Sequence, residues 1–317
     1  MTDTLTRSTE TEMTTTTDRI VLGHNQYGKA EVRVVKVTRD SDRHEIEDLN
    51  VTSQLRGDFQ AAHLAGDNAH VVATDTQKNT IFAFARDGIG SPESFLLRLS
   101  DHFTGEFAWV DGGRWLAESY AWDRIRVDGA EHEHSFVRNG QVTRTAVVVA
   151  DGARRHIIGG LKGLTVLKTT QSGFVGYPKD RYTSLQETTD RILATDVTAR
   201  WRYAEGEEAR ELDFTAIYDD VKRLLLEEFT RRYSAALQTT LFDMGRLVLQ
   251  AHPEIAEIRL SMPNKHHFVV DLSPFGLDNP NEVFFASDRS YGLIEATVTR
   301  EGQAEVPQAW EAATSFC

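Results

Sequence analysis

The densest group of residues able to do chemistry is the segment Pro263-Asn264-Lys265-His266-His267-Phe268. On an extended backbone alternate side chains point to opposite faces, so Asn264 and His266 would share one face. An amide beside an imidazole can bind a polar ligand and move a proton. A polar turn or the start of a strand explains the same residues without a ligand, and the segment by itself favours that interpretation.

Two further segments suit a flat polar ligand. Gln171-Ser172-Gly173-Phe174-Val175-Gly176-Tyr177 places an aromatic side chain between two glycines, so the backbone could approach a ligand while Phe174 stacks on its ring. A bulged strand with a core phenylalanine is an equal alternative. Tyr27-Gly28-Lys29 places a lysine before a strand-like run, where it is a solvated charge unless its surroundings lower its pKa.

The nearest approach to a metal site is His132-Glu133-His134, whose two histidines would share one face of a strand. No third ligand is evident, so a solvated strand end is preferred and no metal site is predicted. The single cysteine, Cys317, permits no internal disulfide and no cysteine-based zinc site. Phosphate-binding glycine loops, H-E-x-x-H and G-x-S-x-G sequences are also missing.

The composition is that of a globular protein without nucleic-acid or membrane partners. The 317 residues include 35 Lys and Arg against 48 Asp and Glu, a formal net charge of −13. An acid excess disfavours binding to nucleic acids and to anionic membranes, and no apolar run approaches the ~18 residues of a membrane helix. Residues 1–19 are expected to be a disordered tail. Residues 305–317 are expected to be a C-terminal tail, loosely held from Pro307.

Between the tails, strand-like and helix-like segments alternate. Helices are expected from Ser91-Pro92-Glu93, over 214–231 and over 235–251, with a serine N-cap in the first and apolar stripes in all. Arg138-Asn139-Gly140-Gln141 predicts a tight hairpin between two strands. Runs of β-branched residues predict strands at Glu31–Val37, Thr145–Ala150, Leu164–Thr170, Phe268–Leu272 and Ile294–Thr299.

A short repeat indicates two halves of similar design. Ala73-Thr74-Asp75 precedes the first expected helix and Ala194-Thr195-Asp196 precedes the second, at similar spacing. Strands, then helices, then strands are typical of an α+β fold with antiparallel sheets. Glycines at 159, 160 and 163 place the boundary near residue 161, giving halves of 20–161 and 162–304.

Several of these segments, taken in order, resemble the urate oxidase (uricase) family. The resemblance covers nearly the whole chain outside the tails, and separate chance matches would not keep the family's order. The matching segments are Tyr27-Gly28-Lys29, Val72 to Thr80, His134-Ser135-Phe136, Gly163 to Lys168, Asp190 to Asp196, Pro263-Asn264-Lys265-His266 and Gly292-Leu293-Ile294.

The resemblance implies a tandem tunnelling fold (T-fold), with two antiparallel sheet halves that each carry helices on one face. It also implies a homotetramer around a tunnel, with active sites where subunits meet. One subunit would supply Lys29, Thr74 and Asp75. Its neighbour would supply the other site residues, which are Phe174, Arg191, Leu237, Gln238, Asn264 and His266.

The family reaction converts urate and O2 to 5-hydroxyisourate and hydrogen peroxide without a metal or organic cofactor. Urate must lose a proton before it can reduce O2. By resemblance, Lys29 is the base, the hydroxyl of Thr74 passes the proton and His266 joins this relay. Asn264 would hold O2, and later water, over the ring plane.

The resemblance also implies how urate is bound. Phe174 would stack under the ring, while Arg191 and Gln238 would bind one edge. The backbone N–H of Leu237 would add a contact, because free N–H groups near a helix start favour an anion. The backbone N–H of Asp75 would complete the contacts on the opposite edge.

Without the resemblance, several of these residues have simpler structural interpretations. Arg191 could form a surface ion pair with Asp190 or Asp196, Thr74 could be a plain strand residue and Gln238 an ordinary first-turn residue of a helix. The family often has an aromatic at Val175 and valine at Leu237.

Two other functions remain open at this point. One is another T-fold purine or pterin enzyme, such as a zinc-dependent ring hydrolase. The other is a non-catalytic purine-binding protein, which would be expected to lack the proton relay. The chain ends Ser315-Phe316-Cys317 rather than in a peroxisomal tripeptide, so a cytoplasmic location is expected.

Overall fold

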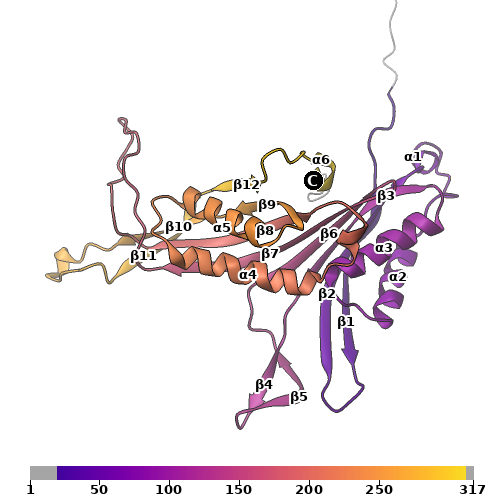
Figure 1. The fold of residues 1–317 in the computed structure, drawn as a ribbon, viewed down its shortest axis with the longest axis horizontal. Helices are drawn as coiled ribbons and strands as arrows, with labels where there is room; N and C mark the ends of the chain where they lie inside the picture. Colours follow the sequence, from indigo (N-terminus) through magenta and orange to yellow (C-terminus); the bar gives the residue numbers. More distant parts are fainter. Residues whose placement is uncertain (1–19, 312–317) are drawn as a thin grey trace, which may run out of the picture.

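One antiparallel sheet of ten strands organises the computed structural model, which describes residues 20–311 (Figure 1). The disorder expected for residues 1–19 lies outside this range. The elements up to the middle of the chain are β1 (Tyr27–Thr38), β2 (Glu45–Gly57), α1 (Gln60–Ala65), α2 (Thr74–Arg86), α3 (Pro92–Glu106), β3 (Val110–Ser119), β4 (Asp123–Val127), β5 (Ala130–Val137) and β6 (Thr143–Asp151). They are followed by β7 (Arg154–Lys168), β8 (Leu193–Tyr203), η1 (Glu207–Arg210), α4 (Phe214–Arg231), α5 (Leu237–Ala251), β9 (Ile255–Ser261), β10 (Asn264–Val269), η2 (Ser273–Phe275), β11 (Phe284–Gly292), β12 (Glu295–Thr299) and α6 (Pro307–Glu311).

The sheet contains the same arrangement of elements twice. In the first arrangement β1 and β2 precede the helices α2 and α3, and β3 and β6 follow them. In the second, β7 and β8 precede α4 and α5, and β9 and β12 follow. The β10–β11 hairpin extends the sheet beyond β8. The predicted α+β class with antiparallel sheets is therefore confirmed. The boundary expected at residue 161 falls inside β7, where the register with β8 shifts between Leu161 and Leu164.

The Ala-Thr-Asp repeat does not mark equivalent positions in the two halves. Ala73-Thr74-Asp75 begins helix α2, whereas Ala194-Thr195-Asp196 lies inside strand β8. By the order of elements, α2 corresponds to α4 and α3 corresponds to α5. The repeat instead implied that α3 corresponds to α4, which is wrong. The sequence did not predict helix α2, because its buried face consists of Gln77, Ile81 and Ala85, which form only a weak apolar stripe.

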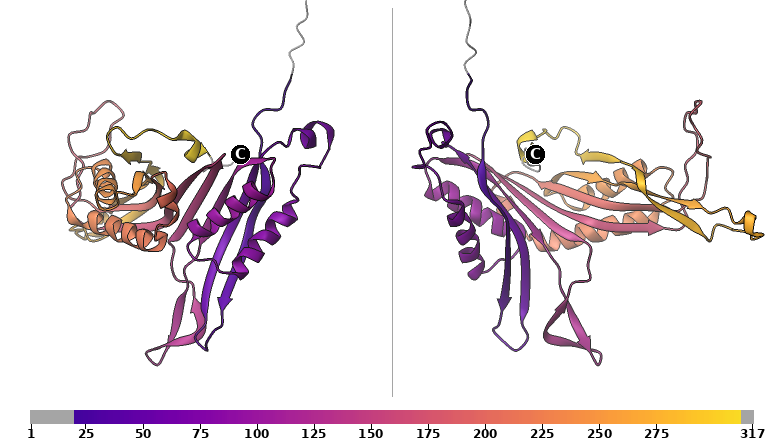
Figure 2. Two further views of the ribbon diagram at one scale, coloured as in Figure 1. Left: turned by 45° about the vertical axis from the view of Figure 1, so that its right-hand side comes forward. Right: turned by 180° about the vertical axis from the view of Figure 1, so that it is seen from behind.

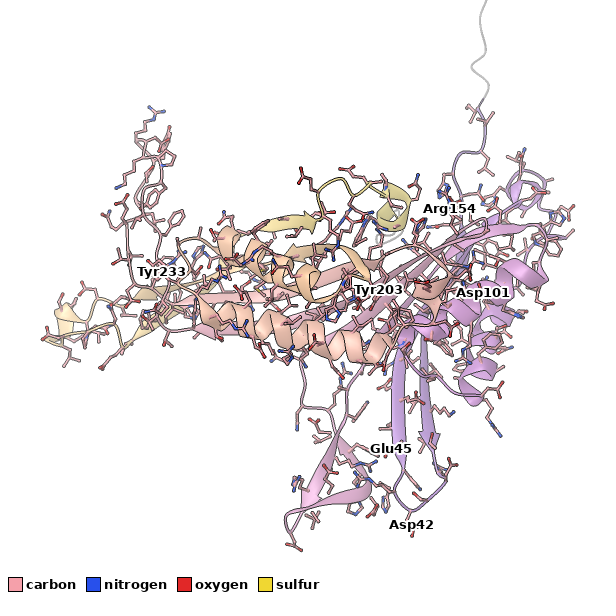
Figure 3. The ribbon with its side chains drawn as sticks, in the orientation of Figure 1. Asp42, Glu45, Asp101, Arg154, Tyr203 and Tyr233 are labelled. Carbon is pink, nitrogen blue, oxygen red and sulfur yellow. The ribbon has the colours of Figure 1, made fainter. Side chains whose placement is uncertain are left out.

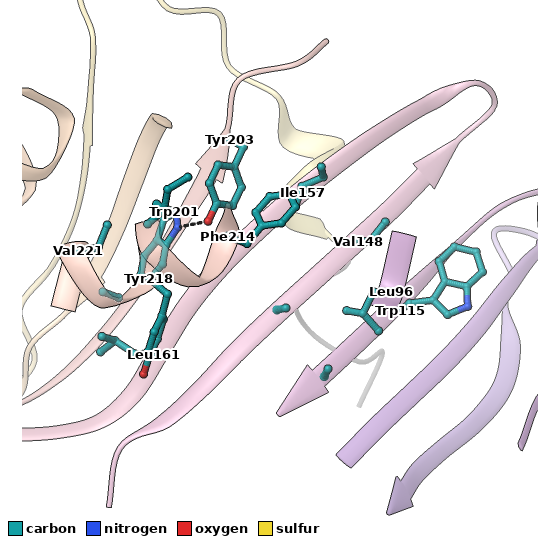
Figure 4. Packing of buried hydrophobic residues seen from close by; sticks show 14 of the residues in the cluster. Leu96, Trp115, Val148, Ile157, Leu161, Trp201, Tyr203, Phe214, Tyr218 and Val221 are labelled. Carbon is teal, nitrogen blue, oxygen red and sulfur yellow. Dashed lines mark hydrogen bonds between the residues drawn. The ribbon is translucent and has the colours of Figure 1, made fainter. Parts of the chain in front are cut away.

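The helices predicted from caps and stripes are confirmed. Ser91 caps α3 by accepting a hydrogen bond from the backbone N–H of Ser94, and α4 spans the predicted residues 214–231. The four long helices cover one face of the sheet (Figure 2). Between them and the strands, Trp115 and Trp201 are fully buried, and the Trp201 indole donates a 3.0 Å hydrogen bond to the Tyr203 hydroxyl (Figure 4).

Two local predictions need correction. The Asn139-Gly140 sequence does not turn a hairpin, because β5 pairs with β4 in a separate two-stranded sheet while β6 pairs with β3 and β7. The end of the chain is not loosely held from Pro307, since Trp310 is buried in α6 and donates a 2.8 Å hydrogen bond to Glu257. Residues 312–317 lie outside the described range.

Helix α6 covers the face of the sheet opposite to the long helices. Trp310 packs with Val147 and Val149, whereas the alternate residue Val148 belongs to the main core. Among residues 20–311, no helix is both long and apolar enough to cross a membrane.

Candidate active site

A cavity of about 890 Å³ brings together four of the predicted site residues near β10. Phe174 follows β7, Arg191 lies two residues before the start of β8, and Asn264 and His266 lie on β10. These segments are far apart in sequence, and the pairing of β8 with β10 places them together. Asn264 and His266 both line the cavity, but His267, Phe268 and Val269 line it too, so the lining does not follow the simple alternation of a strand.

The guanidinium of Arg191 is half-buried and has free donors. Its Nε donates a hydrogen bond to the Ser172 hydroxyl at 3.3 Å, and within residues 20–311 no hydrogen bond or ion pair involves its two Nη groups. Asp190 instead accepts a hydrogen bond from Thr170, and Asp196 lies 3.7 Å from Lys265. The surface ion pair considered for Arg191 is therefore wrong.

The ring of Phe174 lies in the cavity rather than in the core. Its backbone pairs with Thr188, its ring stacks on Tyr177 at 4.7 Å between centroids, and the Arg191 guanidinium carbon lies 5.3 Å from its centroid. A half-exposed aromatic ring beside an unpaired cation can bind a flat anion. The alternative of a core phenylalanine is excluded by this placement.

Helix α5 starts close to this cavity without a side-chain cap. Its N-cap is Ala236, so the first backbone N–H groups, which include those of Leu237 and Gln238, receive no side-chain acceptor there. Leu237 is buried and Gln238 is exposed. Neither residue lines the cavity, but backbone hydrogen bonds between Ser234 and the 171–173 segment tie the helix start to it.

Lys29, Thr74 and Asp75 form a second group. Thr74 is the first residue of α2, whose N-cap, Ala73, also provides no side-chain acceptor. Thr74 is therefore a helix-start residue and not a strand residue. The pKa of the Asp75 carboxyl is lowered, first by its contact with Lys78 and also by the charge of Lys29.

The two groups lie at opposite ends of the molecule. Helix α2 and strand β1 occupy one end of the long axis, and β10 and β11 occupy the other (Figure 1). The view from behind shows the same separation (Figure 2). Tyr233, which precedes α5, marks the end with the cavity, whereas Asp101 of α3, the helix packed beside α2, lies toward the other end (Figure 3). A single copy of the chain therefore does not bring all nine predicted residues together.

The histidine pair on β5 remains a poor candidate for a metal site. The rings of His132 and His134 are 4.6 Å apart and perpendicular. In the part of the chain that the structure describes, no group of three or more His, Cys, Asp or Glu side chains is arranged to hold a metal ion.

Sequence reasoning missed two residues that hold side chains lining the cavity. Ser172 holds the Arg191 side chain and Tyr177 supports the Phe174 ring. Both lie in the glycine-containing segment from Gln171 to Tyr177, but nothing in its local pattern indicates that Arg191 folds back onto it.

The imidazole of His266 is expected to stay neutral at neutral pH. Burial lowers its pKa from the ordinary value of 6.5, and the charges of Arg191 and His267 lower it further. As the pH falls below 6.5, the imidazole therefore takes up a proton in the unfolded chain before it does so in the folded chain. His266 thus lowers the free energy of unfolding at acid pH. An NMR titration of labelled histidine should give a midpoint below 6.5 for His266, shifted upward in Arg191→Gln. A midpoint above 6.5 in the wild-type protein would contradict this electrostatic picture.

The repeated antiparallel unit with helices on one face is the arrangement of a T-fold protein, and its cavity suits a flat anion. Comparison with known proteins narrows this class. The uricase family model matches residues 25–149 and 157–295. Uricase of Arthrobacter globiformis is 61% identical over 309 residues, 98% of this chain and 100% of that protein. Uricase of Danio rerio is 36% identical over 92% of this chain and 99% of its own length. The chain belongs to the uricase family.

Solved structures agree with this assignment. The crystal structure of Arthrobacter globiformis uricase has a TM-score of 0.87 at 62% identity, covering 92% of this chain and 99% of that one. A Bacillus sp. TB-90 urate oxidase mutant has a TM-score of 0.75 at 21% identity, covering 89% of this chain and 100% of that one, which shows that the fold is shared.

Proposed function

We propose that this protein is a urate oxidase that converts urate, O2 and water to 5-hydroxyisourate and hydrogen peroxide in purine catabolism. The observation that carries the proposal is the unpaired Arg191 guanidinium beside the Phe174 ring, in a cavity that also contains Asn264 and His266. Urate is a flat anion, and it matches both the ring face and the free donors of that cation.

Each complete active site is formed by two copies of the chain, in a homotetramer. One copy supplies Lys29, Thr74 and Asp75, and the other supplies the cavity. The support is the separation of the two groups along the molecule and the exposure of Thr74 and Asp75 at an uncapped helix start. The matching arrangements of strands and helices support a division into two halves, with the boundary between β6 and β7 rather than at residue 161 as the bounds 20–161 and 162–304 would have it.

Urate binding uses the side chains of Phe174, Arg191 and Gln238. The backbone N–H groups of Leu237 and Asp75 donate from the starts of α5 and α2. Both helices have alanine where Ser, Thr, Asp or Asn is the usual cap. A missing cap leaves N–H groups available to a ligand, so these two sites favour binding over local stability.

Proton transfer uses Lys29 as the base, the Thr74 hydroxyl as the carrier and neutral His266 as a relay partner. Asn264 holds O2 and then water above the ring. No metal or organic cofactor takes part, since the urate dianion itself supplies the electrons that reduce O2.

The test is an assay on metal-stripped protein that follows urate by ultraviolet absorbance, O2 by electrode and peroxide by a coupled reaction. Equal loss of urate and O2 with matching peroxide is the expected result. Activity that requires added zinc and consumes no O2 would support the ring hydrolase instead. Tight urate binding without turnover would support the non-catalytic purine-binding protein.

A further inference from the structure

We infer that Ser172 is a positioning residue that holds the Arg191 side chain in its urate-binding orientation. This inference rests on the proposed function and deepens it, because it names a residue outside the predicted site that determines how well urate binds.

Ser172 contacts Arg191 at two places. The Arg191 backbone N–H donates a 2.9 Å hydrogen bond to the Ser172 carbonyl, and the Arg191 Nε donates at 3.3 Å to the Ser172 hydroxyl. The first contact fixes the backbone and the second fixes the plane of the guanidinium. Both Nη groups then remain available for an oxygen and a nitrogen on one edge of urate.

Ser172 is itself rigidly held. It is fully buried and bridges in parallel to Ser234, whose backbone accepts from Gly173 and donates to Gln171. A Cβ atom at Gly173 would lie 2.0 Å from the Tyr233 hydroxyl oxygen and 2.9 Å from the Thr188 carbonyl oxygen, and because the carbonyl is fixed backbone, glycine is favoured there. The Ser172 hydroxyl is therefore a fixed acceptor and not a mobile surface group.

The junction between the 171–173 segment and Ser234 also joins the parts of the binding site. Phe174 follows Ser172 by two residues, and helix α5 with Gln238 follows Ser234 by a short stretch. Because Arg191 docks on this junction, the stacking ring, the guanidinium and the uncapped helix start share one support. Without the hydroxyl, the long Arg191 side chain regains rotational freedom that urate binding must remove.

The experiment measures urate binding by calorimetry without O2, and steady-state turnover with O2, for Ser172→Ala. Loss of a hydrogen bond to a charged group predicts about a tenfold increase in Kd and KM, with kcat within about twofold of wild type. Ser100→Ala, which removes an equally buried serine hydroxyl far from the cavity, is the control for stability. Ser172→Gly removes the same hydroxyl and serves as a second variant.

A double-mutant cycle separates positioning from general loosening of the structure. Lysine has no Nε donor equivalent to that of Arg191, so Ser172→Ala should change urate Kd much less in an Arg191→Lys background. Equal losses in both backgrounds, or unchanged Kd in Ser172→Ala, would overturn the inference alone. Wild-type protein that neither binds nor oxidises urate would overturn the proposed function and this inference with it.

Discussion

Replacing Lys29 or Thr74 with alanine is expected to lower kcat for urate about 10²- to 10⁴-fold, the usual contribution of a positioned acid or base. Urate affinity should change little, because Phe174 and Arg191, which bind urate, come from a second copy of the chain. The expected outcome is therefore bound urate that cannot lose its second proton.

Rapid mixing with O2 and calorimetry without O2 measure these two quantities separately. Lys36→Ala removes a lysine further along the same strand and provides the matched control, with kcat expected near wild type. Unchanged kcat in both Lys29→Ala and Thr74→Ala would exclude the proposed relay. A loss confined to affinity would assign these residues to binding instead.

Replacing Arg191 with alanine is expected to lower kcat/KM for urate by about 10²-fold or more, since removing one partner of a desolvated charged pair costs ~2–5 kcal/mol. The loss should fall mainly on KM. The structure supports this size because the guanidinium is half-buried and its Nη groups have no partner within residues 20–311.

Arg191→Lys keeps the charge but loses the planar fork, so it should recover only part of the activity. Arg181→Ala removes an exposed arginine from the protruding loop after Phe174 and is the control for a change in net charge alone. Equal effects of Arg191→Ala and Arg181→Ala would show that Arg191 acts only through long-range electrostatics.

Local patterns predicted the fold where they were strong. The serine cap of α3 and the apolar stripe of α4 depend on a few neighbouring residues, and both helices lie where those residues place them. Helix α2 has little apolar stripe because Gln77 occupies its buried face, where it accepts a hydrogen bond from Ser53 of β2. That contact joins distant segments, so no local pattern reveals it.

The candidate site shows the same limit. Residue types indicated the chemistry of Phe174, Asn264 and His266, but the partner of Arg191 depends on how the 171–174 segment pairs with Thr188 and Ser234. The Asn139-Gly140 prediction failed for a different reason, since β5 already pairs with the preceding strand β4 across the two-residue turn Asp128-Gly129, where both φ angles are positive. The competing local turn decided that pairing, whereas the contact between Ser172 and Arg191 depends on tertiary packing.

The central claim is that each active site joins Lys29 of one copy to Arg191 of another, and subunit mixing tests it most directly. Lys29→Ala and Arg191→Ala, each nearly inactive alone at urate concentrations well below the KM of Arg191→Ala, are unfolded, mixed in equal amounts, refolded together and assayed at such concentrations. Random assembly of shared sites predicts recovery of about a quarter of wild-type activity, because one site in four combines two intact halves.

The matched control mixes Lys29→Ala with Thr74→Ala, whose altered residues belong to the same half of the site. That mixture should stay inactive, since every site lacks either the lysine or the threonine. Recovery in the first mixture alone is the predicted result. No recovery in the first mixture, with wild-type protein refolding normally under the same conditions, would contradict an active site shared between subunits.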